Sequence, residues 1–273
     1  MNTIRIFDNE IISFINSLKV VQISFRVIIT SLALVLVNSC NSESSSDCLQ
    51  KSGDLILQEI TVPEFSKITV YEKIVLVVKE GTTQKVEIET GENLLNDISV
   101  TVEDDRLLLR NDNGCNLFRE YGITKIHVTS PNITQIRSSS GLPIQSDGVL
   151  NYQSIELLTE SYLVPDALTT DSEFNLELNV ETVSVVVNGI AYFKLRGAAE
   201  NLSLYVASGD SRIEAENLLA DKVTINHRGS NDLFVNPVES ITGIIRGNGD
   251  VISGNIPPIV EVDEQYKGKL IFK

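Results

Sequence analysis

Two copies of the pattern Arg-Gly-x-x-Asp carry the side chains of this sequence that are best suited to binding chemistry: Arg228 with Asp232, and Arg246 with Asp250. A guanidinium group forms fork-like hydrogen bonds with carboxylate or sulfate groups. One interpretation is therefore a groove for a carboxylated or sulfated glycan. We favour the other interpretation, a row of surface ion pairs at the corners of a repeat, which would contribute little to stability.

Repeated strand-turn-strand units surround these two copies, between Leu202 and Gly254. Each unit opens with alternating apolar residues, turns at a polar cluster that contains glycine, and resumes with a second short strand. A unit of about 20 residues cannot bury its apolar side alone, so it stacks on its neighbours. Because stacked strands lie about 4.8 Å apart, the two arginines should be adjacent, and so should the two aspartates. The repeat predicts an all-β, solenoid-like fold.

Further strands extend this pattern over one domain, residues 55–273. Between residues 55 and 128, short strands of period two alternate with polar turns. This spacing is expected to include antiparallel strands towards the N-terminal end, and it also suits a β-sandwich. Each rung is one turn of the chain around the interior, and rungs are expected to open at Ile155, Leu176, Leu202, Val223 and Ile241.

Calcium is a second interpretation of the turns, because carboxylate and amide oxygens are its usual ligands. The same residue types are also ordinary turn formers, and we expect no metal or cofactor. His227 shares a strand face with Val223 and Ile225, which indicates a buried, hydrogen-bonded histidine. His127 lies on the polar side of its strand, and we expect it to be exposed. The Asn and Asp residues of the turns are Asp210, Asn231, Asp232, Asn248 and Asp250.

An apolar run over residues 27–37 follows two basic residues near the start of the chain. The run is too short for a bilayer, which needs about 20 residues, and its flanks are typical of a cleaved export signal over residues 1–39. The sequence VNSC that ends at Cys40 resembles a bacterial lipobox, in which the cysteine is acylated. We therefore expect lipidation at Cys40 and anchoring to the outer membrane, on its periplasmic or external face. The alternative is an uncleaved signal anchor.

Residues 40–54 comprise this cysteine and a Ser-rich, acidic stretch that is typical of a flexible tether. Lipidation of Cys40 leaves Cys48 and Cys115. Two cysteines in an oxidising compartment most simply form one disulfide. The alternative is a free, reactive pair.

Net charge restricts the partners of the protein. The formal net charge is −15 and the sequence pI is about 4.6. Such acidity repels nucleic-acid phosphates and anionic lipid headgroups, so we expect no nucleic-acid partner and no polybasic membrane patch. The hydrophobic content of 42% is sufficient for a core, and the absence of Trp indicates an aliphatic one.

Several short segments together carry a resemblance to a known family. They are FSKITV (65–70), IVLVV (74–78) with Gly81, GENLL (91–95), CNLFR (115–119), and GNGDV (247–251) with Gly254 and Pro257. These segments resemble the GIN-domain family, described as the head domain of "putative autotransporter adhesins" and of unknown function, and GENLL and CNLFR resemble its lipoprotein branch. The resemblance covers roughly Leu55 to Phe272 and implies a right-handed, β-helix-like solenoid, an exported lipid-anchored protein and no established enzymatic activity. The sequence departs from the family at residues 161–171 and 187–189, which leaves the turn geometry of the middle rungs open.

Three functions are compatible with these features. The first is a non-catalytic envelope protein whose rigid surface binds a glycan or a cell-surface protein, as the family resemblance implies. The second is a Ca²⁺-dependent polysaccharide lyase, in which Arg228, Arg246 and Asp250 would act on a uronate. The third is a scaffold for another envelope protein. We expect the first of these, because the sequence shows only this small cluster and no longer row of catalytic side chains.

Overall fold

The structure is a computed structural model of the 273-residue chain, and it describes residues 50–114, 121–160, 162 and 167–273. A compact unit contains Ser52–Gly114 and Arg119–Lys273. Within its described residues, 17 strands form a single, mostly parallel sheet, together with one 3-10 helix, η1 (Glu92–Asp97). The first ten strands are β1 (Leu55–Ile60), β2 (Lys67–Val70), β3 (Val75–Glu80), β4 (Lys85–Gly91), β5 (Ile98–Glu103), β6 (Arg106–Asn111), β7 (Lys125–Ser130), β8 (Gln135–Ser138), β9 (Pro143–Leu150) and β10 (Ser154–Leu158).

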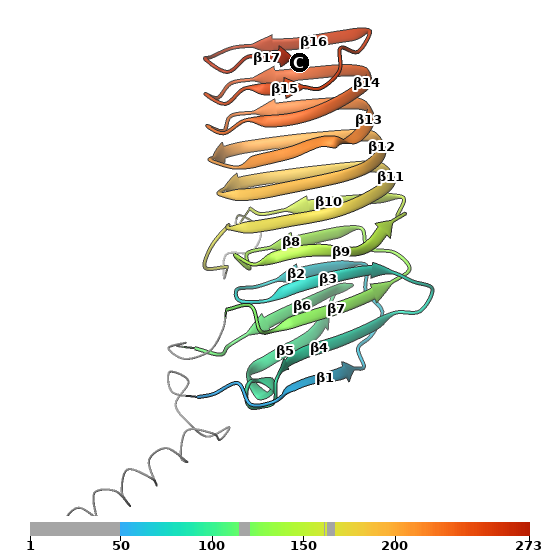
Figure 1. The fold of residues 1–273 in the computed structure, drawn as a ribbon, viewed down its shortest axis with the longest axis vertical. Coiled ribbons are helices and arrows are strands. Elements are labelled where there is room, and N and C mark those ends of the chain that lie inside the picture. Colours follow the sequence, from blue (N-terminus) through green and yellow to red (C-terminus); the bar gives the residue numbers. More distant parts are fainter. Residues whose placement is uncertain (1–49, 115–120, 161, 163–166) are drawn as a thin grey trace, which may run out of the picture. The chain divides into compact units, whose positions relative to one another are not determined.

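Long bent strands form the C-terminal part of the sheet, in which the chain coils in a β-helix-like manner (Figure 1). Each long strand has a first arm, a bend and a second arm, and both arms pair in parallel with the next strand. The first arm of β14 pairs with β15, and its second arm pairs with β16. Strand β17 pairs with β15. These strands are β11 (Ser172–Gly189), β12 (Ala191–Gly209), β13 (Arg212–His227), β14 (Leu233–Ile245), β15 (Val251–Ser253), β16 (Ile259–Glu264) and β17 (Leu270–Phe272).

Strand register confirms four of the five expected rung positions. Ile155 pairs with Val183 of the next strand. From rung to rung, Val183 then pairs with Leu202, Leu202 with Val223, and Val223 with Ile241, so these residues occupy equivalent positions. The prediction for Leu176 is wrong, because this residue lies in the first arm and pairs with Leu195. Both arms carry the same apolar alternation, so periodicity alone does not distinguish them.

Antiparallel pairs occur at the N-terminal end, as predicted, and the β-sandwich alternative is wrong because all 17 strands belong to one sheet. Strand β4 pairs antiparallel with both β1 and β7, and β5 forms a hairpin with β6. Asp104 and Asp105 connect that hairpin with φ angles of 44° and 67°. Two positive φ angles are typical of the tight turns that match the twist of a hairpin.

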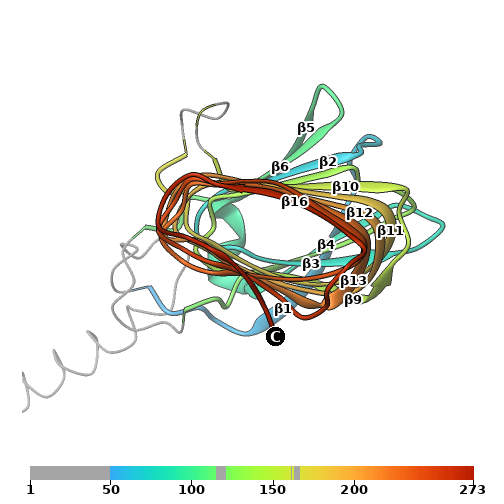
Figure 2. The same ribbon diagram turned by 90° about the horizontal axis from the view of Figure 1, so that it is seen from above.

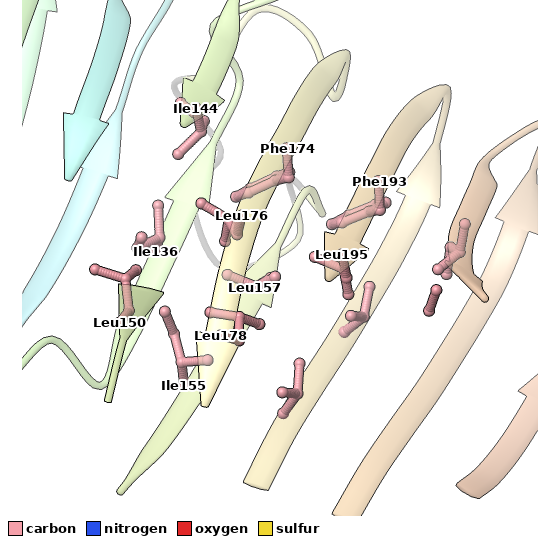
Figure 3. Packing of buried hydrophobic residues seen from close by; sticks show 14 of the residues in the cluster. Ile136, Ile144, Leu150, Ile155, Leu157, Phe174, Leu176, Leu178, Phe193 and Leu195 are labelled. Carbon is pink, nitrogen blue, oxygen red and sulfur yellow. The ribbon is translucent and has the colours of Figure 1, made fainter. Parts of the chain in front are cut away.

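The core is one continuous aliphatic cluster that extends through the interior of the stack from Phe65 to Val251. Figure 2 shows the rungs superposed around this interior. Phe174 and Phe193 are fully buried, and their rings lie parallel with centroids 4.8 Å apart (Figure 3). This distance equals the usual spacing between paired strands. Identical side chains at equivalent positions of adjacent rungs therefore stack directly.

Candidate functional site

The two Arg-Gly-x-x-Asp copies form the turns between successive rungs, and we call residues 228–232 and 246–250 the turn edge. The Arg228 N–H donates to the Val206 carbonyl at 2.9 Å, and the Arg246 N–H donates to the His227 carbonyl at 2.7 Å. Each arginine therefore directly follows the second arm of its rung. The two arginines lie in adjacent rungs, as the repeat predicts, and both side chains are exposed.

Neither arginine takes part in the predicted row of ion pairs. Among the described residues, no ion pair joins the guanidinium of Arg228 or Arg246 to a carboxylate. The ion-pair interpretation is therefore wrong for the described part of the chain. Two like charges on neighbouring strands repel each other, so an anion that contacts both would relieve this repulsion.

The two aspartates have a different role from the arginines. Asp232 Oδ1 accepts a hydrogen bond from the Asp250 backbone N–H at 2.9 Å. Asp250 Oδ1 accepts one from the Lys269 backbone N–H at 2.8 Å. Each carboxylate thus binds the turn of the following rung. The aspartates stabilise the turn edge, and the arginines are its free charged groups within the described structure.

His227 lies directly beneath the turn edge and is fully buried, as predicted. The Gly229 N–H donates to its Nδ1 at a long distance of 3.4 Å. Burial lowers the pKa of His227 below its ordinary value of 6.5, although the backbone at Asn231 and the carboxylates of Asp232 and Asp250 oppose this shift. The imidazole is therefore held in its neutral form.

The free energy of unfolding should decrease when the pH is lowered from 7.5 to 5.5, because of His227. The pKa of His227 in the folded protein is below its pKa in the unfolded chain. As the pH falls through the unfolded pKa, the unfolded chain therefore binds a proton at this position before the folded protein does. One such proton corresponds to a slope of at most about 1.4 kcal/mol per pH unit. Urea unfolding at several pH values should show a smaller slope for His227→Leu than for the wild type. The same slope in the wild type and His227→Leu would refute this assignment.

A second polar cluster, which the sequence analysis missed, lies on the outer face of β3, β4, β7 and β9 beside a cavity of about 260 Å³. Glu89 accepts from Lys125 Nζ at 2.7 Å and pairs with His127 Nε2 at 3.0 Å. Lys125, and to a smaller extent His127, lowers the pKa of Glu89. The prediction of an exposed His127 is therefore wrong, since its side chain is 32% exposed and paired. Opposite charges are already matched here, which makes the cluster a weaker candidate for ligand binding.

Three serines at the end of β8 form a buried corner. Ser140 Oγ donates to the Ile74 carbonyl, and Ser139 Oγ accepts from the guanidinium of Arg137 at 3.3 Å. Arg137 itself is 1% exposed and donates through Nε to the Glu160 carbonyl at 3.1 Å. These hydroxyl groups satisfy neighbouring polar groups in the interior, so none of them is placed as an accessible nucleophile.

Several predictions concern residues outside the described part of the chain. Cys40, Cys48, Cys115, the signal segment 1–39 and most of the tether belong to this group. Within the described residues, no helix is long and apolar enough to span a membrane. The same residues contain no group of three or more His, Cys, Asp or Glu side chains placed to hold a metal ion.

Comparison with solved structures shows the same fold in bacterial proteins. "A putative adhesin" from Bacteroides fragilis NCTC 9343 has a TM-score of 0.70 and 23% identity, over 81% of this chain and 97% of that one. A "putative lipid binding protein" from Parabacteroides distasonis ATCC 8503 has a TM-score of 0.53 and 13% identity, over 80% and 97%. "A putative adhesin" from Parabacteroides merdae ATCC 43184 has a TM-score of 0.50 and 17% identity, over 81% and 97%. At these identities the likeness concerns the fold alone.

Comparison of the amino-acid sequence with family models assigns the chain to a family. No curated protein matches the chain. Residues 64–257 match a family model, and this segment includes the turn edge and most of the stacked strands. The chain therefore belongs to the family described as "Putative auto-transporter adhesin, head GIN domain".

Proposed function

We propose that this protein is an exported, lipid-anchored envelope protein that binds carboxylated or sulfated glycans through Arg228 and Arg246. The observation that carries the proposal is the pair of exposed, adjacent guanidinium groups that have no carboxylate partner among the described residues. Carboxylates are abundant in this chain of net charge −15, yet none of the described ones pairs with either arginine. Each guanidinium can form a fork-like pair with an anionic group of a polysaccharide.

The family description supports a role in adhesion, and the sequence supports the anchor. We propose that residues 1–39 are removed, that acylated Cys40 holds the protein in the outer membrane, and that the tether separates the domain from the lipid. Cys48 and Cys115 would form the disulfide. We also infer that the stack is a right-handed solenoid, because connections between parallel strands are right-handed in about 98% of cases.

The proposed binding is not accompanied by catalysis. A Ca²⁺-dependent lyase would need Asp250 to hold the cation beside a basic arginine. In the structure, Asp250 Oδ1 instead accepts the Lys269 N–H at 2.8 Å, and Asp232 Oδ1 accepts the Asp250 N–H. These bonds favour a supporting role for both carboxylates. The proposal therefore includes no cofactor.

Expression of the full chain in a Gram-negative host tests the anchor and the binding site separately. Isolated membranes should retain labelled polygalacturonate or heparin but not neutral dextran. Arg228→Ala/Arg246→Ala should stay in the membrane fraction and lose binding by about ten-fold or more, because hydrogen bonds to charged groups contribute about 1.5–3 kcal/mol each. Cys40→Ser should leave the membrane fraction and, once purified, bind as the wild type does.

Arg196→Ala is the matched control, because Arg196 lies on the first arm of β12 and away from the turn edge. An equal loss of binding in this variant would show that general charge is responsible. Retention of Cys40→Ser in the membrane fraction would refute the lipid anchor. Release of uronate during the assay would support a lyase instead.

A further inference from the structure

A groove follows the bends of the long strands, at the opposite end of the arms from the turn edge. It has a volume of about 760 Å³ and crosses β11, β12, β13 and β14. In the register of these strands, Val180, Ala199, Ala220 and Pro237 occupy equivalent positions at the bend. All four are buried, and Val180 and Ala199 also line this hollow, which we call the corner groove.

Apolar side chains in the corner groove face solvent. Leu219 is 54% exposed and Val238 is 42% exposed, and the two lie on adjacent rungs. Ala198, the partner of Leu219 on the preceding rung, also lines the groove. Ile190 and Tyr205 of the central rungs are also exposed, at 64% and 44%, but neither lines the groove. Exposed apolar surface within a concave site is typical of a docking site.

Carboxylates line the same groove, one from each of three successive rungs. They belong to Glu181, Glu200 and Asp221. Among the described residues, none of the three forms an ion pair, although Lys222 follows Asp221 directly. The Glu181 carboxylate accepts one hydrogen bond, from Gln153 Nε2 at 3.3 Å. Like charges at the spacing of paired strands repel each other, and a cationic ligand would remove this repulsion.

We propose that the corner groove binds an extended, cationic and apolar peptide segment of a partner protein. Lysine or arginine side chains of the segment would pair with Glu200 and Asp221. Its alternate apolar side chains would cover Leu219 and Val238. Three carboxylates on adjacent rungs span about 10 Å, which two cationic side chains on one face of an extended segment can reach.

Charge distinguishes this partner from other occupants. A second copy of the chain carries the same net charge of −15 and would add carboxylates to the groove. The described residues contain no group of three acidic, His or Cys side chains close enough to hold a metal ion. Anionic glycans, nucleic acids and lipid headgroups would be repelled. This surface and the glycan site at the turn edge have opposite charges, so the two proposals stand independently.

Titration of the purified full chain with two synthetic peptides tests the proposal. The first alternates Lys and Val over eight residues, and the second has Glu in place of Lys. The Lys peptide should bind and the Glu peptide should not. Glu200→Gln/Asp221→Asn should weaken binding by about ten-fold, as expected for two exposed ion pairs. Leu219→Ser should weaken it by about ten-fold through loss of apolar contact.

One matched control variant separates this site from general charge. Glu173→Gln/Glu177→Gln removes the same charge from the first arm of β11, outside the groove, and should leave binding unchanged. Equal loss in this control, or absence of binding to the Lys peptide, would overturn the proposal. Concentration-dependent dimerisation that Leu219→Ser abolishes would assign the groove to a second copy of the chain. Binding of Ca²⁺ that Glu200→Gln/Asp221→Asn abolishes would assign it to a cation.

Discussion

Replacement of Phe193 by alanine is expected to lower the free energy of unfolding by about 3–5 kcal/mol, the usual effect of removing a buried aromatic ring. Phe193 is fully buried, and its ring stacks on that of Phe174 at 4.8 Å with an angle of 3° between the planes. The variant would leave a cavity between two rungs. Parallel strands on both sides prevent the backbone from closing it.

Urea unfolding followed by circular dichroism measures this loss. The matched control is Phe234→Ala, because Phe234 lies on the outer face of β14 beneath Arg212, with 4.4 Å between the guanidinium carbon and the ring centre. Lys273 Nζ also lies 5.2 Å from the centre of this ring. We expect this control to lose about 1–2 kcal/mol, the contribution of two exposed cation–π contacts. Similar losses in the two variants would mean that the ring stack has no special role in stability.

Replacement of Gly247 by alanine is expected to destabilise the protein by about 3 kcal/mol, the upper part of the usual range for overpacking. A Cβ atom at this position would lie 2.1 Å from the Gly229 carbonyl oxygen of the preceding rung. The same oxygen accepts the Asn248 N–H at 3.1 Å. The rungs would have to separate at the turn edge, and this hydrogen bond would lengthen.

Gly254→Ala is the matched control, because a Cβ atom there would have its nearest neighbour at 3.8 Å, an ordinary van der Waals contact. Thermal unfolding of the two variants should show a clearly lower midpoint for Gly247→Ala only. Equal midpoints would show that the turns tolerate a wider spacing. Glycan binding by Gly247→Ala below its unfolding midpoint should also be weaker, because the two arginines would move apart.

The stacked strands could be predicted from the sequence because their pairing is local. Residues about one rung apart repeat the same apolar alternation, and this is sufficient to place Arg228 beside Arg246. The pairing of β2 with both β6 and β8 could not be predicted in this way. The three strands are far apart in the chain and share no repeat, so alternation indicates strands there without indicating their neighbours.

Hydrogen bonds explain the errors at the candidate site. The repeat places Asp232 next to Asp250, but residue spacing does not show that each carboxylate accepts a backbone N–H of the following turn. The alternation along β7 predicts an exposed His127, because its neighbours Ile126 and Val128 are apolar and face the interior. Its partner Glu89 lies on β4, and the antiparallel pairing that joins them is not visible in the sequence.

The sequence separation between contacting residues differs between the two ends of the stack, and this difference affects how each end assembles. In the C-terminal rungs, contacts join residues about one rung apart, as for Asn201 and Glu181, which are 20 residues apart. At the N-terminal end, Ser66 and Thr134 are in contact across 68 residues. Closing the longer loop costs about 1 kcal/mol more in chain entropy. Rungs near the C-terminus can therefore open and re-form on their immediate neighbours, whereas the N-terminal sheet closes only after distant segments of the chain have returned to it.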